Sequence, residues 1–163
     1  RCVSSLALPM TVQFSFTKLE ATNLNMFSDT DLRGHWSIIF IYPKDNTSGC
    51  TRETKEFNEK YSDFRALGVR VFGLSKDTLA SHISFSKKLD LQFSLISDPE
   101  TQLIRNLGAW KEKSMYGKKY MGAERSTFLI DGNLRIKHVW RKVKVDGHVG
   151  EVFDKCKQLI QGV

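Results

Sequence analysis

Cys50 is the residue of this sequence best placed to act as a nucleophile. It follows an apolar run over residues 36–42 and a short loop, PKDNTSG, at residues 43–49. It precedes an amphipathic run that reaches about Leu67. This order predicts a strand, a tight loop and a helix that begins at or near Cys50. A helix N-terminus favours negative charge, so a thiol placed there ionises readily to a nucleophilic thiolate.

The loop before Cys50 consists of residues that favour sharp turns. Pro43 restrains the backbone where it leaves the strand, and the Asn, Ser and Gly that follow permit a tight turn. Thr47 lies three residues before Cys50, so its hydroxyl could reach a group bound at the sulfur. A lone cysteine is more often an inert core residue, but these polar, turn-forming neighbours indicate a functional one.

The three cysteines are Cys2, Cys50 and Cys156. Because they are far apart and odd in number, the sequence predicts neither a disulfide framework nor a CxxC zinc or redox site. This usage suits a reducing compartment, and we expect a cytoplasmic protein. The histidines lie in different predicted elements without ligand spacing, so we expect no metal and no cofactor: His35, His82, His138 and His148.

The length and composition predict one globular domain. The chain has 163 residues, 40% of them hydrophobic and 26% charged, which is enough for a full core over residues 11–163. Residues 1–10 are expected to be a tail that need not be native, since Met10 is a candidate natural start. No apolar run approaches the length of a membrane span.

Strands alternate with helices along most of the chain. We expect strands at residues 36–42, 69–74, 93–96 and 126–130, with a hairpin partner at 134–140 and a weak early strand at 11–19. We expect a helical turn at 28–34, helices at 51–67, 77–89 and 100–107, and a terminal helix from Val149 to Ile160. Residues 23–32 read as turn-like, and residues 109–122 read as a polar loop. In the 77–89 helix the candidate core positions are Leu79, Ile83, Phe85 and Leu89. The pattern predicts an α/β fold with a mixed sheet, and a thioredoxin-like arrangement fits it.

The pattern Pro43-x-x-x-Thr47-x-x-Cys50 resembles the active-site signature of the peroxiredoxins. The wider stretch YPKDNTSGCT, at residues 42–51, is similar to the bacterioferritin-comigratory-protein (BCP, or PrxQ) subfamily. The resemblance continues through KEKSMYGKKY at 111–120 and RSTFLID at 125–131, and it covers most of residues 34–161.

The resemblance implies a three-layer, thioredoxin-like fold and a thiol-dependent peroxidase that reduces hydrogen peroxide and organic hydroperoxides. Cys50 would be the peroxidatic cysteine, oxidised to sulfenic acid. Thr47 would hold the peroxide, with Gly49 beside it. Pro43 would shield the sulfur, and Arg125 matches the family's active-site arginine. The implied roles are antioxidant defence and redox homeostasis.

Two further groups of residues are candidates for the same site. Glu53 sits one helical turn after Cys50 and could orient Arg125. Trp110 and Tyr116 could line the pocket, or could simply pack.

The chain departs from the family pattern at the resolving cysteine. Lys55 occupies one usual position, and the 77–89 helix, the other usual place, carries serines instead. Cys156 lies on the apolar stripe of the terminal helix and is a weak candidate to resolve Cys50. We therefore expect one-Cys behaviour, with thioredoxin, glutaredoxin or a low-molecular-weight thiol as the reductant.

A second hypothesis follows from the net charge of +7. A basic thioredoxin-like domain could bind nucleic acid or client proteins without any chemistry at Cys50. The lysines and arginines are spread along the chain without a recognised pattern, so we expect no nucleic acid and no membrane as partners. We expect a monomer or a weak dimer.

Overall fold

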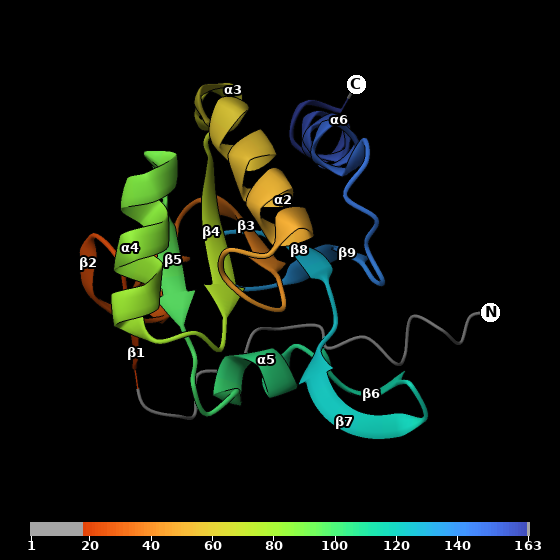
Figure 1. Cartoon of the computed structure of the whole chain (residues 1–163). Helices are drawn as coiled ribbons and strands as arrows, with labels where there is room; N and C mark the ends of the chain where they lie inside the picture. The colour runs from red at the N-terminus through yellow and green to blue at the C-terminus, as the bar shows by residue number, and fades with distance from the viewer. Residues whose placement is uncertain (1–17, 163) are drawn as a thin grey trace.

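The computed structural model describes residues 18–162, which are built around a seven-stranded mixed sheet (Figure 1). Its strand order is β2-β1-β5-β4-β3-β8-β9. The strands are β1 (Leu19–Ala21), β2 (Leu24–Phe27), β3 (Trp36–Ile41), β4 (Val69–Ser75), β5 (Ser94–Ser97), β8 (Ser126–Ile130) and β9 (Ile136–Trp140). Strands β3, β4 and β5 are parallel, whereas β8 pairs antiparallel with β3 and β9 antiparallel with β8. The expected mixed sheet is confirmed.

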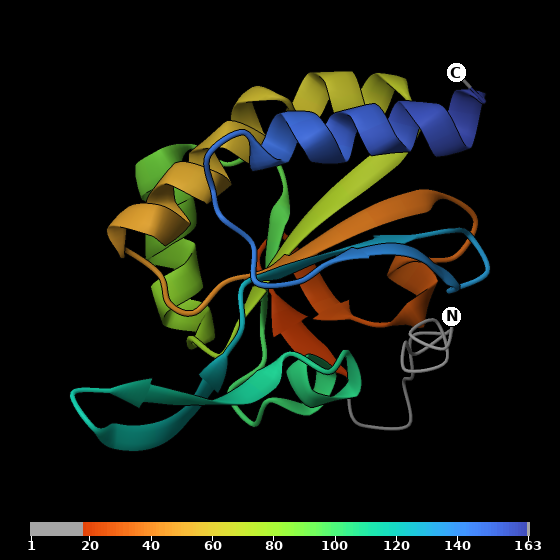
Figure 2. The same cartoon turned by 90° about the vertical axis from the view of Figure 1, so that its right-hand side faces the viewer.

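Helices cover both faces of this sheet. They are η1 (Asp29–Asp31), α2 (Ser48–Glu59), α3 (Tyr61–Ala66), α4 (Leu79–Leu89), α5 (Gln102–Asn106) and α6 (His148–Gln161). Helices α2, α3, α4 and α6 share one hydrophobic cluster with one face of the sheet, and η1 and α5 adjoin the other cluster. Figure 2 shows α6 and α2 above the sheet and α5 below it. This is the three-layer arrangement that was expected.

The central strand β3 is buried on both sides. Ile38 and Phe40 face the cluster under α2, whereas Ile39 and Ile41 face the opposite cluster. This accounts for the continuous apolar run, since a strand covered on both faces needs no polar positions. The loop that follows β3, and the start of α2, lie at the C-terminal end of the parallel strands.

The prediction of a polar loop at residues 109–122 is wrong, because most of these residues form a hairpin. Strand β6 (Trp110–Met115) pairs with β7 (Lys118–Ala123) as a separate two-stranded sheet that projects from the body (Figures 1 and 2). Tyr116 and Gly117 have φ angles of 52° and 79°, which suit a two-residue hairpin turn. Most side chains of the hairpin are exposed on both faces, so the alternation that signals a strand is absent.

Several element boundaries also differ from expectation. The helix expected at 51–67 is two helices that meet at Lys60, and α4 begins at Leu79, not at residue 77. Within α4, Ile83 is 43% exposed, whereas His82 and Phe85 are buried. Strand β2 lies within the segment expected to be turn-like. The early strand expected at 11–19 falls almost entirely outside the described residues.

The remaining expected elements agree with the structure within a few residues. None of the helices within residues 18–162 has the length and apolar surface that crossing a bilayer would demand.

Gly73 in β4 has the least room for a side chain among the described glycines. A Cβ there would lie 2.6 Å from Leu95 Cδ2, 3.0 Å from Phe40 Cζ and 3.3 Å from Tyr42 Cε1. We expect Gly73→Ala to lower the free energy of unfolding by roughly 1–3 kcal/mol, because overpacking forces buried side chains to move. Denaturant titration measures this change.

Gly150→Ala in α6 is the matched control. No atom lies within 4 Å of a Cβ built on Gly150, so the same substitution should raise the free energy of unfolding by up to about 1 kcal/mol. Equal effects of the two substitutions would show that the space around Gly73 does not limit stability.

Candidate active site

Cys50 lies in the first turn of α2, as its sequence position predicts. Thr47 is the N-cap residue, and the first helical hydrogen bond runs from Thr51 N–H to Thr47 C=O at 2.8 Å. The N–H groups before Thr51 therefore have no acceptor within the helix and point out of its N-terminal end. Cys50 itself is 0% exposed and belongs to the hydrophobic cluster under α2.

The loop before Cys50 turns sharply at Asn46, whose φ is 67°. Pro43 follows the end of β3 and is half-buried. The Thr47 side chain is exposed, and its hydroxyl donates a hydrogen bond to Lys44 C=O at 3.0 Å. The expectation that this hydroxyl reaches a group bound at the sulfur stays a prediction.

Arg125 comes to Cys50 through the pairing of β3 with β8. Ser126 pairs with Ile41, so the residue just before β8 lies level with the start of the loop. Arg125 Nη2 donates to Cys50 Sγ at 3.3 Å, although the two residues are 75 positions apart. Gly49 leaves room for this contact, since a Cβ on it would lie 3.2 Å from Arg125 Nη2.

Glu53 holds the other end of the same guanidinium. Arg125 Nη1 donates to Glu53 Oε1 at 2.7 Å, and the side chains are 17% and 0% exposed. Burial raises the pKa of Glu53 to about 7, although Arg125 offsets part of that effect. Burial also opposes the charge of Arg125, but Glu53 and Cys50 together raise the pKa of its guanidinium.

These contacts favour negative charge at the sulfur. A guanidinium and a helix N-terminus both stabilise an anion, and both do so more strongly when water is excluded. By accepting from Nη1, Glu53 orients the planar guanidinium so that Nη2 faces the sulfur. Its second carboxylate oxygen, Oε2, is buried and has no hydrogen-bond partner among the described residues.

Other residues singled out in the sequence lie away from this contact. Tyr116 is 98% exposed at the tip of the β6–β7 hairpin. Lys55 is exposed on α2. Cys156 is 0% exposed in α6, and burial raises the pKa of its thiol to about 12, which agrees with a core role. Cys2 lies outside the described residues.

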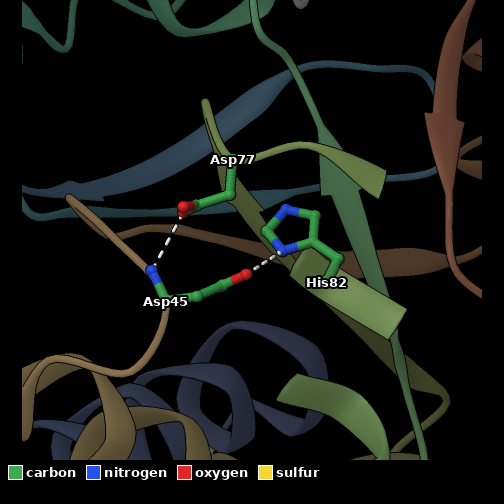
Figure 3. A group of neighbouring side chains, drawn as sticks. All are labelled: Asp45, Asp77 and His82. Atoms are coloured by element: carbon green, nitrogen blue, oxygen red, sulfur yellow. Dashed lines mark hydrogen bonds and ion pairs between the residues drawn. The ribbon is translucent and has the colours of Figure 1, made fainter. Parts of the chain in front are cut away.

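Asp45 and His82 are two buried polar residues near the site that the sequence interpretation missed. His82 Nδ1 lies 2.8 Å from Asp45 Oδ2, and both residues are almost fully buried (Figure 3). A signal was present in the sequence. His82 is spaced by three residues from Leu79 and from Phe85, so it shares their side of α4 and faces the core.

Comparison with known proteins identifies the family. The profile described as the AhpC/TSA family matches residues 11–139. The chain is 44% identical over 124 residues to peroxiredoxin Bcp of Xanthomonas campestris, covering 76% of this chain and 78% of that protein. It is 41% identical over 130 residues to peroxiredoxin Bcp of Bacillus subtilis, covering 80% and 83%.

Solved structures agree with this assignment. The bacterioferritin comigratory protein of Xanthomonas campestris superposes with a TM-score of 0.84 at 38% identity, covering 88% of this chain and 92% of that one. A cysteine-to-serine mutant of PrxQ from Xylella fastidiosa superposes with a TM-score of 0.86 at 38% identity, covering 92% and 94%. The chain therefore belongs to the AhpC/TSA family and is a peroxiredoxin of the Bcp/PrxQ type, a thiol-dependent peroxidase.

Proposed function

We propose that Cys50 is the peroxidatic cysteine and that this enzyme reduces hydrogen peroxide and organic hydroperoxides through it. The observation that carries the proposal is the 3.3 Å contact between Arg125 Nη2 and Cys50 Sγ at the N-terminus of α2. The related Xanthomonas campestris protein is described as having alkyl peroxide reduction activity, which supports organic hydroperoxides as a substrate class.

The Cys50 thiolate attacks the terminal oxygen of the hydroperoxide. A sulfur–oxygen bond forms as the oxygen–oxygen bond breaks, so sulfur loses two electrons and becomes sulfenic acid. The leaving group, hydroxide or alkoxide, takes a proton and departs as water or alcohol. Arg125 stabilises the thiolate before attack and the charge that builds on the leaving oxygen during it.

The remaining site residues shape the space around the sulfur. Glu53 orients Arg125 through the 2.7 Å ion pair. Gly49 has no side chain, so the guanidinium of Arg125 can occupy the space beside it. Pro43 shields the sulfur from water, and Thr47 turns its hydroxyl from Lys44 C=O to the peroxide when substrate binds.

An external thiol reduces the sulfenic acid in two steps. The first thiol displaces water and forms a mixed disulfide with Cys50, and a second thiol releases Cys50. Cys156 is a poor alternative, since burial raises the pKa of its thiol to about 12. Thioredoxin, glutaredoxin or a small thiol acts as this external reductant in our proposal. We place the enzyme in the reducing cytoplasm, as a monomer or a weak dimer.

Cys50→Ser should abolish peroxidase activity, because a hydroxyl cannot replace the thiolate as a nucleophile. We expect peroxide consumption with dithiothreitol to fall by at least about 10³-fold. Cys156→Ala is the matched control and should keep turnover, since the external thiol does the resolving.

Two outcomes would contradict this assignment. Equal peroxide consumption by Cys50→Ser and the parent enzyme would remove Cys50 from the reaction. A stoichiometric Cys50–Cys156 disulfide, seen by mass spectrometry after one equivalent of peroxide, would replace the one-Cys cycle with an internal one.

Arg125→Lys tests whether the guanidinium fork matters beyond its charge. A lysine keeps the positive charge but cannot donate to Cys50 and Glu53 through one planar group. We expect the second-order rate constant for oxidation of Cys50 by peroxide to fall by about 10²-fold, measured by stopped-flow fluorescence. Arg33→Lys, at an exposed pair with Asp29, should leave that rate unchanged. Similar rates for both variants would argue against the assigned role.

Glu53→Gln should change how stability depends on pH. The folded state raises the pKa of Glu53 to about 7, above an unfolded value near 4.3. Its stabilising contribution is therefore complete below about pH 4 and is lost as pH rises through 7. The free energy of unfolding of the parent relative to Glu53→Gln should fall by about 3 kcal/mol between pH 4.5 and pH 8. Parallel pH profiles of the two proteins, from urea titrations, would exclude this shift.

A further inference from the structure

A buried network of polar side chains lies beside the loop that precedes Cys50. Figure 3 shows its central members, Asp45 from the loop, Asp77 from the segment after β4, and His82 from α4. Asp45 and His82 are 4% and 0% exposed. Nothing in the proposed peroxidase chemistry uses these groups, so their burial calls for another explanation.

His82 faces a hydrogen-bond acceptor at each ring nitrogen. Nδ1 lies 2.8 Å from Asp45 Oδ2, and Nε2 lies 3.0 Å from Ile96 C=O. A carbonyl can only accept, so Nε2 donates to it. The ring therefore connects the carboxylate of the loop to the backbone of β5.

Asp45 is arranged to be an anion. Its Oδ1 accepts from Tyr42 O–H at 2.7 Å, and its Oδ2 accepts from Ser81 O–H at 2.8 Å as well as from His82. Burial acts against the charge, but these donors, His82 first among them, lower the pKa of Asp45. Three donors to one buried carboxylate favour its charged form.

The backbone of Asp45 is held from a second direction. Its N–H donates to Asp77 Oδ2 at 2.9 Å, and Ser75 O–H donates to the same oxygen at 2.6 Å. The loop is thus tied to α4 by its side chain and to the end of β4 by its main chain. Three of these side chains could offer ligand atoms within 4.8 Å of one another, but those atoms already have protein partners.

We propose that Asp45 and His82 are positioning residues, a buried hydrogen-bonded pair that holds the loop at residues 43–47 and thereby sets the geometry and the accessibility of Cys50. This inference rests on the proposed role of Cys50. The loop leads directly into Thr47, the N-cap of α2, so motion of Asp45 displaces the N-terminal turn from which the sulfur and the N–H groups are presented. Because Cys50 is 0% exposed, a reagent as bulky as iodoacetamide reaches the sulfur only when this loop moves.

Disrupting the pair should therefore raise the rate of one reaction of the Cys50 sulfur and lower the rate of another. Loosening the loop exposes Cys50 to a neutral alkylating reagent, which needs no binding site. The same loosening moves the hydrogen-bond donors around the sulfur out of the positions that peroxide attack requires. A residue that only stabilises the fold would not separate these two rates.

His82→Gln and Asp45→Asn test the proposal in the full-length enzyme. We expect alkylation of Cys50 by iodoacetamide, read from its own peptide by mass spectrometry, to rise about tenfold, and oxidation of Cys50 by hydrogen peroxide to slow about tenfold. A tenfold change in loop opening corresponds to about 1.4 kcal/mol. Hydrogen exchange of the backbone amides at residues 43–50 should accelerate with it. Because the two residues act as one pair, the double variant should differ little from either single variant.

Two further variants test whether the changes in rate arise from a general loss of stability. Ile130→Val removes a buried methylene at the far end of β8 and should leave both rates within about twofold. Ser81→Ala removes one donor to Asp45 Oδ2 and should give a smaller change in the same directions, even where His82→Gln fails to fold.

Unchanged alkylation and hydrogen exchange in both His82→Gln and Ser81→Ala would overturn the proposal, while Cys50→Ser could still abolish turnover. Conversely, loss of the Cys50 assignment would appear as retained peroxidase activity in Cys50→Ser, with the loop measurements unaffected. The two ideas therefore fail separately.

Discussion

The contact between Arg125 and Cys50 depends on two features of the fold. It requires β8 to lie antiparallel beside β3, so that Arg125 enters level with the loop. It also requires α2 to begin within a few residues of the end of β3, which brings Cys50 to the same place. Sheet pairing and helix placement are therefore both conditions for the charge environment of the sulfur.

Glu53 shows how the site balances charge away from water. Burial and the ion pair with Arg125 act on its pKa in opposite directions, and burial prevails. A buried ion pair in which Glu53 Oε2 has no hydrogen-bond partner among residues 18–162 is a poor source of stability. Its value lies in geometry, because a guanidinium bonded at Nη1 leaves Nη2 directed at the sulfur.

The loop before Cys50 carries two kinds of residue. Turn-forming residues shape its backbone, and Asp45 attaches it to α4 and to the end of β4. The first kind is visible in the sequence because turn propensity is local. The second is not, since an aspartate after Pro43-Lys44 looks like an ordinary surface residue until α4 supplies His82.

The sequence by itself determined most of the strands and helices after residue 36, the position of Cys50 at the start of α2 and the family resemblance, because these depend on local patterns. It did not reveal the β6–β7 hairpin, whose exposed faces show no alternation. Only the tertiary structure decided that Cys50 is fully buried, that Glu53 binds Arg125, that Thr47 donates to Lys44 C=O, and that His82 meets Asp45. The physical reason is that burial and charge pairing arise between segments distant in the chain, 75 residues apart for Arg125 and Cys50, and no local pattern encodes which of them will meet.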